Sequence, residues 1–148
     1  GIPDDKRPLT PEGEKRFRMA ARGLARIASP PDALLTSPLP RARRTAEIAA
    51  TAWGNRVRPK DTPALASGDW EDLAAVVATY PRDATLALVG HEPHLSQLLS
   101  RLIGAREAER LTFRKGGAAL VELFDEPSSG GALLWFMPPR ILRKAGAP

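Results

Sequence analysis

The sequence predicts an α/β sandwich built around a mostly parallel sheet. Apolar runs of strand length alternate with segments of helical periodicity along most of the 148 residues. The run 85–90 is apolar on both faces, as a central strand covered on both sides should be. Two late apolar runs, 118–124 and 132–137, enclose a polar stretch typical of a hairpin loop. A chain of this length has room for one domain, so we expect a single domain over residues 1–148.

The first half of the chain is predicted to hold two helices and two short strands, over 11–28, 33–36, 41–52 and 56–60. Thr10 is a good N-cap, Pro11 suits the first turn, and the proline pair after Ser29 ends the first helix. The apolar run that follows is short and bounded by prolines, which favours a buried strand. Helical spacing of small and apolar residues resumes after Pro40, and the second strand is expected to point Val57 inward.

The second half is predicted to continue with elements over 69–80, 85–90, 93–103, 118–124, 132–137 and 140–145. The helix over 69–80 turns Leu73, Val76 and Val77 inward, and Pro81 ends it. Gly104 ends the next helix, because glycine readily adopts the left-handed conformation that follows a helix C-terminus. The two late strands form the hairpin, and a short helix closes the chain.

Composition excludes several classes of protein. Hydrophobic residues make up 43% and charged residues 26%, which is typical of a globular domain and argues against disorder, collagen and coiled coil. No apolar stretch approaches the ~20 residues of a membrane span, and the start has no signal-peptide pattern. We therefore expect a cytoplasmic location and no membrane partner. The chain has no cysteine and two histidines, which excludes cysteine chemistry and argues against a histidine-rich metal site.

The net charge of +5 favours anionic partners, which include phosphate, acidic protein and nucleic acid. Nucleic acid is the least favoured, because aromatic residues are only 5% and the basic residues are scattered along the chain. A basic domain that binds nucleic acid or another anion remains the alternative that is not an enzyme.

Candidate functional residues follow the predicted strands, where ligands bind in parallel α/β sheets. His91 comes directly after the strand 85–90, and Arg41 opens the helix that follows Ser37. Arg41 could fork onto phosphate oxygens, and Arg44 shares roughly its helix face whereas Arg43 does not.

Each of these residues also has an ordinary interpretation. His91 could be a surface histidine in a loop, and the arginines could form a solvated basic helix start. His94 is interpreted as a supporting or surface residue. Three carboxylates are possible proton donors by position, although each could equally be an ordinary helix N-terminal charge: Asp69, Glu71 and Glu92.

Three motifs occur in order at fitting spacing. They are Arg-Pro-Leu-Thr-Pro-Glu-Gly at 7–13, Ser-Pro-Leu-Pro-Arg-Ala-Arg-Arg-Thr-Ala at 37–46 and Leu-Val-Gly-His-Glu-Pro at 88–93. Together they resemble the signature of the SixA-like phosphohistidine phosphatases, small members of the histidine phosphatase superfamily, which also holds phosphoglycerate mutases. The resemblance extends over essentially the whole chain, including the segments 114–118 and 135–138.

The resemblance implies the three-layer α/β/α sandwich of that superfamily and a phosphatase that works through a phosphohistidine intermediate. It implies that Arg41 clamps phosphate, that His91 is the second active-site histidine and contacts the transferring phosphoryl group, and that Arg7 faces the same pocket. Glu92 is a possible acid. The expected substrate is phosphohistidine on a protein, with a small phosphomonoester as the other possibility, and no metal or cofactor is expected.

One motif of the family does not occur in these 148 residues. The nucleophilic histidine of the family lies in an Arg-His-Gly or Arg-His-Ala motif that ends the first strand, upstream of the Arg-Pro-Leu-Thr motif. This chain contains no Arg-His pair. We expect that strand and its histidine to lie upstream of Gly1. The alternative is a phosphate-binding pseudo-enzyme that uses Arg41 and His91 without turnover.

Overall fold

The computed structural model describes residue 3 and residues 6–148. Its elements are α1 (Pro11–Ile27), β1 (Ala33–Thr36), α2 (Pro40–Ala52), β2 (Pro59–Asp61), α3 (Ala64–Ser67), α4 (Trp70–Ala78), β3 (Leu86–Val89), α5 (His94–Ile103), η2 (Ala108–Leu111), β4 (Ala118–Leu123), η3 (Pro127–Ser129), β5 (Gly131–Met137) and α6 (Pro139–Gly146). Every predicted helix and strand has a counterpart, and α3 and the two 3₁₀ turns are additional.

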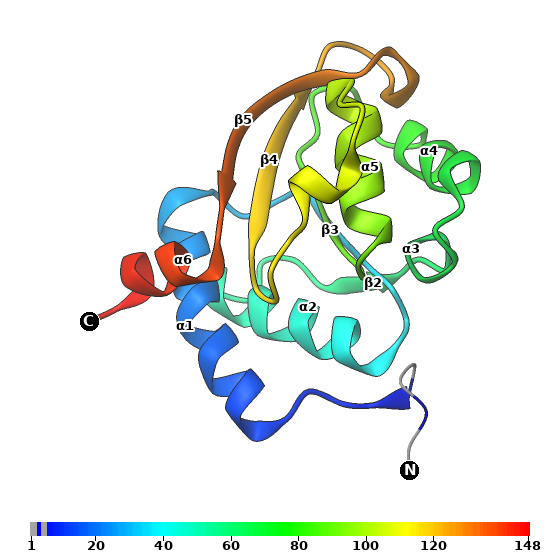
Figure 1. Ribbon diagram of the computed structural model, residues 1–148. Helices are drawn as coiled ribbons and strands as arrows, with labels where there is room; N and C mark the ends of the chain where they lie inside the picture. The colour runs from blue at the N-terminus through cyan, green and yellow to red at the C-terminus, as the bar shows by residue number, and fades with distance from the viewer. Residues whose placement is uncertain (1–2, 4–5) are drawn as a thin grey trace.

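The strands form two groups (Figure 1). Strands β2, β1 and β3 make a parallel sheet with β1 in the centre, and Leu34 of β1 lies opposite Ala87 of β3. Strands β4 and β5 form an antiparallel hairpin. The predicted α/β class with a mostly parallel sheet is therefore confirmed.

The two faces of β1 build two separate cores, because successive side chains of a strand point to opposite faces. Leu34 packs with α2 residues such as Ala46 and with Trp53, and α1 adds Phe17 and Leu24. On the opposite face, a second cluster joins β1 to α3, α4 and α5; its members include Leu35, Leu65, Leu73 and Leu98. Helices thus cover both faces of the sheet, as Figure 1 shows, and the three-layer sandwich is confirmed.

Helix α1 begins as predicted and packs closely against the end of the chain. The Oγ1 atom of Thr10 accepts a hydrogen bond from the Gly13 N–H at 3.0 Å, which caps the helix. Further along α1, a Cβ atom built on Gly23 would lie 1.8 Å from the Leu142 carbonyl oxygen of α6. Reciprocally, a Cβ on Gly146 would lie 1.9 Å from the Met19 carbonyl oxygen. Glycine at both positions lets the two helix backbones touch.

Two predictions about strands need correction. The run 85–90 is covered on both faces as predicted, since Ala87 and Val89 pack in one core and Leu88 in the other, but the only strand partner of β3 among the described residues is β1. All four of its residues are half-buried. The strand expected over 56–60 spans Pro59–Asp61, and Val57 is buried just before it. The pattern of hydrophobic residues in the sequence indicates which residues are buried. A buried loop residue such as Val57 fits this pattern as well as a strand residue does.

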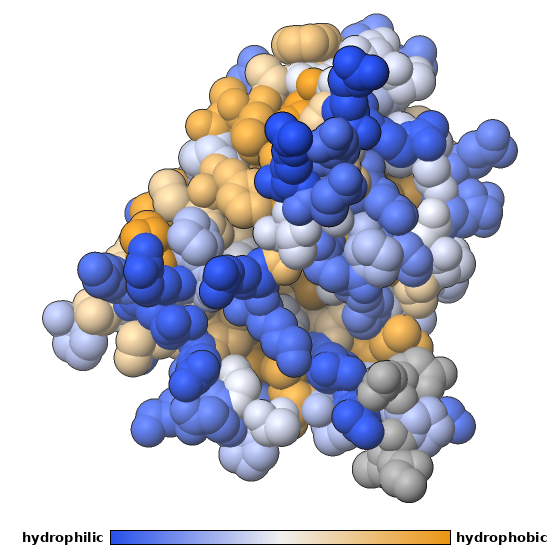
Figure 2. Space-filling view, in the orientation of Figure 1, coloured by the Kyte–Doolittle hydropathy of each residue, from blue (hydrophilic) through white to orange (hydrophobic). Residues whose placement is uncertain are grey.

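The surface is unevenly polar. Figure 2 shows hydrophobic residues gathered over the β4–β5 hairpin, while hydrophilic residues dominate the helical part of the same view. Leu133 and Leu134 of β5 are 36% and 52% exposed, and Phe124, just after β4, is 71% exposed. Among the described residues, no helix is both long enough and apolar enough to cross a membrane.

Candidate functional site

The end of β1 is the structural base of the site. Thr36 and Ser37 are fully buried, although both carry hydroxyl groups. The Ser37 N–H donates to the Val89 carbonyl at 2.9 Å, and the Thr36 carbonyl accepts from the Thr62 N–H at 2.7 Å. These bonds hold the polar end of β1 between its two neighbouring segments, so Ser37 is held at the carboxyl edge of the sheet.

His91 lies directly against Ser37. Its Nε2 atom is 2.7 Å from the Ser37 Oγ, a contact between residues 54 apart in the chain. The same Oγ accepts the Leu39 N–H at 3.2 Å, just before α2 begins. Through this serine, His91 is joined to the loop that leads into Arg41.

The surroundings of His91 favour a neutral imidazole. Burial lowers the pKa of His91, and the charges of His94 and Arg41 lower it further. The Arg41 charge is the smallest of the three effects on the His91 pKa. That the two side chains bind one anion stays a prediction from their positions after parallel strands.

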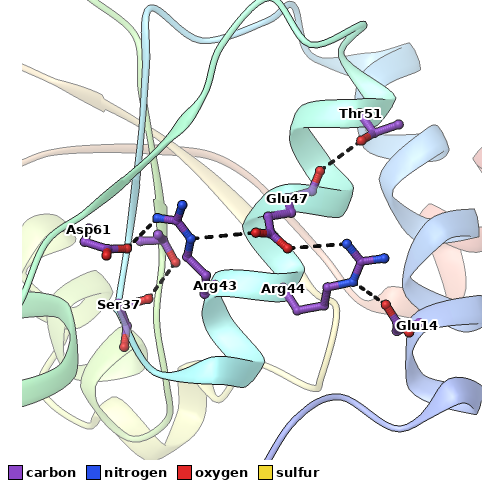
Figure 3. Close-up of polar contacts among 8 residues, drawn as sticks. Glu14, Ser37, Arg43, Arg44, Glu47, Thr51 and Asp61 are labelled. Atoms are coloured by element: carbon purple, nitrogen blue, oxygen red, sulfur yellow. Dashed lines mark hydrogen bonds and ion pairs between the residues drawn. The ribbon is translucent and has the colours of Figure 1, made fainter.

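The neighbouring arginines of α2 are engaged elsewhere (Figure 3). Arg43 pairs with Asp61, the last residue of β2, at 2.5 Å, and with Glu47 at 3.8 Å. Arg44 pairs with Glu47 at 3.3 Å and with Glu14 of α1, and its hydrogen bond lowers the pKa of Glu14. The basic run is thus not a uniform patch, because Arg43 and Arg44 are neutralised by carboxylates that tie α2 to β2 and α1.

Glu92 has a structural role that sequence reasoning did not find. Its Oε1 accepts the Ser96 N–H at 2.8 Å, within the first turn of α5. Its Oε2 accepts the Phe113 N–H at 3.2 Å, in the segment before β4. The Glu92 carboxylate thus ties the start of α5 to the segment before β4, and its role as an acid stays a prediction.

The other candidates are dispersed. Asp69 caps α4 by accepting the Asp72 N–H at 3.1 Å, and Glu71 lies in the first turn of the same helix. His94 is the first residue of α5, and its ring lies against Gly68. Arg7 is exposed in the segment before α1, and its approach to His91 stays a prediction.

The arrangement suits an oxyanion. His91 lies beside Ser37 at the carboxyl edge of the sheet, Arg41 lies in the first turn of α2, and the N-terminal end of a helix favours negative charge. Over residue 3 and residues 6–148, no group of three or more His, Cys, Asp or Glu side chains is placed to hold a metal ion. The chemistry that this chain's own residues can supply is charge stabilisation by fixed cations and dipoles.

Comparisons with known proteins give a consistent result. The family model of the histidine phosphatase superfamily (branch 1) matches residues 4–86. An uncharacterized protein of Picosynechococcus sp. (strain PCC 7002) is 34% identical over 119 residues, which cover 77% of this chain and 70% of that protein.

Solved structures are similar over nearly the whole chain. The protein histidine phosphatase SixA, in complex with tungstate, is 26% identical with a TM-score of 0.81, covering 96% of this chain and 90% of that chain. Two structures described as putative phosphohistidine phosphatases SixA support the fold. The one from Agrobacterium tumefaciens is 23% identical with a TM-score of 0.76, and the match covers 94% of this chain and 88% of that one. The one from Nakamurella multipartitia is 24% identical with a TM-score of 0.74 and the same coverage.

Proposed function

The chain belongs to the histidine phosphatase superfamily (branch 1), and on this premise we propose that it removes phosphoryl groups from phosphohistidine on a protein. The reaction runs through a covalent phosphohistidine intermediate. The observation that carries the proposal is the 2.7 Å contact between His91 Nε2 and the buried Ser37 Oγ, at the strand end that leads into Arg41. The tungstate complex of SixA supports an oxyanion site in a protein of the same fold, since tungstate resembles phosphate in shape and charge.

In the first step, a histidine nitrogen attacks the phosphorus atom of the substrate. A new nitrogen–phosphorus bond forms, the bond to the substrate's imidazole breaks, and the leaving imidazole carries a proton. Water then attacks the phosphoenzyme and releases inorganic phosphate. Dividing one displacement into two lowers each barrier, provided that the negative charge of the phosphoryl oxygens is stabilised in both steps.

Arg41 and His91 provide that stabilisation in this proposal. Arg41 can donate two parallel N–H bonds to two phosphoryl oxygens. Burial and neighbouring positive charge lower the pKa of His91 and so disfavour its protonated form in the free protein. A bound phosphoryl group carries negative charge, which reverses that balance and favours a charged imidazole as the transferring group arrives.

We place the nucleophile on a strand between β3 and β4. Among the described residues, β3 pairs only with β1 and β4 only with β5, so each has an edge without a strand partner. An unpaired backbone group in the interior costs about 1–3 kcal/mol, which a strand in this position would recover. A histidine at its carboxyl end would lie at the same edge of the sheet as Ser37 and His91.

The encoded sequence upstream of Gly1 tests this placement. An Arg-His pair that closes an apolar strand is expected there, within about 15 residues, the length of one strand and its flanks. An upstream sequence without histidine would support the pseudo-enzyme alternative.

Phosphate release from a phosphohistidine peptide by the full-length protein tests the activity itself. The expected trapped intermediate is a phosphoenzyme that is labile in acid and stable in alkali, as phosphohistidine is. Tight binding of tungstate with no phosphate release and no phosphoenzyme would identify a pseudo-enzyme.

A further inference from the structure

A pocket of about 390 Å³ lies between α5 and the segment formed by α3 and α4. Its volume is within the range of small-ligand sites. His91 and Arg41 do not line it, so it is distinct from the oxyanion site. Its lining combines apolar side chains, such as Leu65, Leu73 and Leu98, with side chains that carry polar or charged groups, namely Asp69, Trp70, His94, Gln97, Ser100, Arg101 and Arg106.

Two buried polar atoms of this pocket have no hydrogen-bond partner among the described residues. They are the Oγ of Ser100, a residue that is 7% exposed, and the Nδ1 of His94. A buried polar atom without a partner costs about 1–3 kcal/mol, so such atoms are rare unless a ligand or water completes them. Both atoms belong to residues that line the same cavity. Both atoms are shielded from solvent, so a ligand in the cavity would be contacted by the exposed groups of the lining instead.

The charged side chains of the pocket indicate what kind of ligand it binds. The Arg101 guanidinium lies over the Trp70 ring, 4.6 Å from its centroid, which fixes the position of the cation. Within the described part of the chain, neither Arg101 nor Arg106 forms an ion pair with a carboxylate. Asp69 is the one acidic residue that lines the pocket, and its side chain accepts the Asp72 N–H. Two cations beside apolar lining residues suit a carboxylate carried on a short aliphatic chain.

The pocket adjoins the oxyanion site. His94 forms part of its wall and lies three residues after His91, and the charge of His94 acts on the His91 ring. The His94 ring is held in this position by close contact with Gly68, where a Cβ would lie 2.6 Å from the His94 Cδ2. A peptide whose phosphorylated residue occupies the oxyanion site advances about 3.3 Å per residue when extended. A side chain a few residues away can reach the pocket.

Resting on the proposed function, we propose that this pocket binds the carboxylate of a glutamate or aspartate that neighbours the phosphorylated residue of the protein substrate. The pocket would then select acidic sequences around the phosphoryl group. Arg101 and Arg106 supply the donors, and Trp70 orients Arg101.

Direct binding is the first test, and Trp70 supplies its signal. The full-length protein is titrated with unphosphorylated acetyl-Gly-Glu-Gly-amide and with the matching Gln peptide, and tryptophan fluorescence is recorded. We expect the Glu peptide to bind about tenfold more tightly, since a hydrogen bond to a charged group is worth more than one to a neutral group. Trp70→Phe should abolish the fluorescence change, and Arg101→Gln should remove the preference for Glu. Equal binding of the two peptides by the wild-type protein would overturn the proposal.

Selectivity in turnover is the second test. Phosphohistidine peptides carry Glu or Gln at successive positions on either side of the phosphorylated residue. At one or more positions, the wild-type kcat/KM should be about tenfold higher for Glu, and Arg101→Gln should bring the ratio near one. Arg110→Gln is the matched control, because Arg110 pairs with Glu107 outside the pocket and should leave the ratio unchanged. A wild-type ratio near one at every position would overturn the proposal.

Free glutarate distinguishes a substrate side chain from a small effector. If the pocket binds a Glu side chain of the substrate, glutarate competes with the Glu peptides and leaves turnover of the Gln peptides unchanged. An equal effect of glutarate on both peptides would mean that the pocket serves a free carboxylate, which overturns the proposal. Failure of the proposed function looks different, because no peptide would release phosphate while the fluorescence preference for Glu persisted.

Discussion

Arg41 and Arg43 are two residues apart in one helix, yet the structure gives them different surroundings. Arg41 acts on His91, whereas Arg43 is paired with Asp61 and Glu47. Replacing Arg41 by Ala in the full-length protein should lower the phosphatase kcat/KM by about 100-fold or more, on the scale of losing a major transition-state donor. Arg41→Lys should recover little, because an ammonium group cannot fork across two oxygens.

Arg43→Ala is the control for that experiment. It removes two exposed ion pairs, each worth about 0–1 kcal/mol of stability, and should change kcat/KM by less than about twofold. Steady-state kinetics of the three variants decide the matter. Equal losses for Arg41→Ala and Arg43→Ala would mean that the basic run acts as a diffuse patch.

The protonation of His91 should depend on bound anion. Its pKa is lowered in the folded protein by burial and by the charges of His94 and Arg41, relative to an ordinary value of about 6.5. NMR titration of the two histidines should therefore show His91 titrating below that value, with His94→Asn used for assignment. Tungstate should raise the His91 pKa, because the anion offsets the positive charge of Arg41. Titration at or above the ordinary value would contradict this account of the site.

The same shift has a consequence for stability. Below about pH 6.5 the unfolded chain binds a proton at this position before the folded protein does. The free energy of unfolding should consequently fall as the pH is lowered through that window, and His91→Asn should flatten this part of the profile. Above the window, both states hold a neutral imidazole and the contribution of His91 is constant.

The sequence predicts candidate site residues only where a local pattern indicates them. His91 follows an obvious strand and Arg41 follows a Ser-Pro turn, so position and family resemblance both indicate them. The hydrogen bond between the His91 and Ser37 side chains spans 54 residues and has no local signal. The two backbone N–H partners of Glu92 likewise have no signal in the sequence, from which Glu92 is predicted only as a possible acid.

At the scale of elements, helix ends were predictable and strand neighbours were not. The N-cap at Thr10 and the left-handed Gly104 that ends α5 depend on residues within one turn, so the sequence predicts them well. Pairing between strands joins distant segments, and apolar runs alone do not reveal partners. Hence β3 was expected to be central, whereas its only strand partner among the described residues is β1.

The contact between α1 and α6 depends on glycine. Gly23→Ala would gain about 1 kcal/mol of helix propensity in α1. The new methyl group would meet the backbone of α6, with Leu142 O only 1.8 Å from the Cβ position. Overpacking of this kind costs about 1–3 kcal/mol and forces the helices apart, so we expect a net loss of stability. Urea denaturation measures it, with the exposed neighbour Arg22→Ala as control. Equal or higher stability of Gly23→Ala would show that α6 does not pack here.

At the scale of the whole molecule, the two cores explain why the site is rigid. Leu34 and Leu35, adjacent in β1, anchor helices on opposite faces of the sheet. Both cores converge on the strand that ends at Ser37, so displacing the site requires disrupting one of them. Binding groups held in this way lose little freedom when an anion arrives, which favours preorganised charge stabilisation.

The fold as a whole therefore predicts where an oxyanion binds. His91 follows β3, Arg41 follows β1 in the first turn of α2, and the two strands are neighbours in one parallel sheet, so both residues are expected at its carboxyl edge. A crystal of the full-length protein soaked in tungstate should show the anion between the two side chains, about 3 Å from both. Arg7 should approach the same anion, and His94 should not touch it, because its ring lies against Gly68. An anion bound only at Arg43 and Arg44, or His91 and Arg41 on opposite edges of the sheet, would refute the phosphatase proposal for this chain.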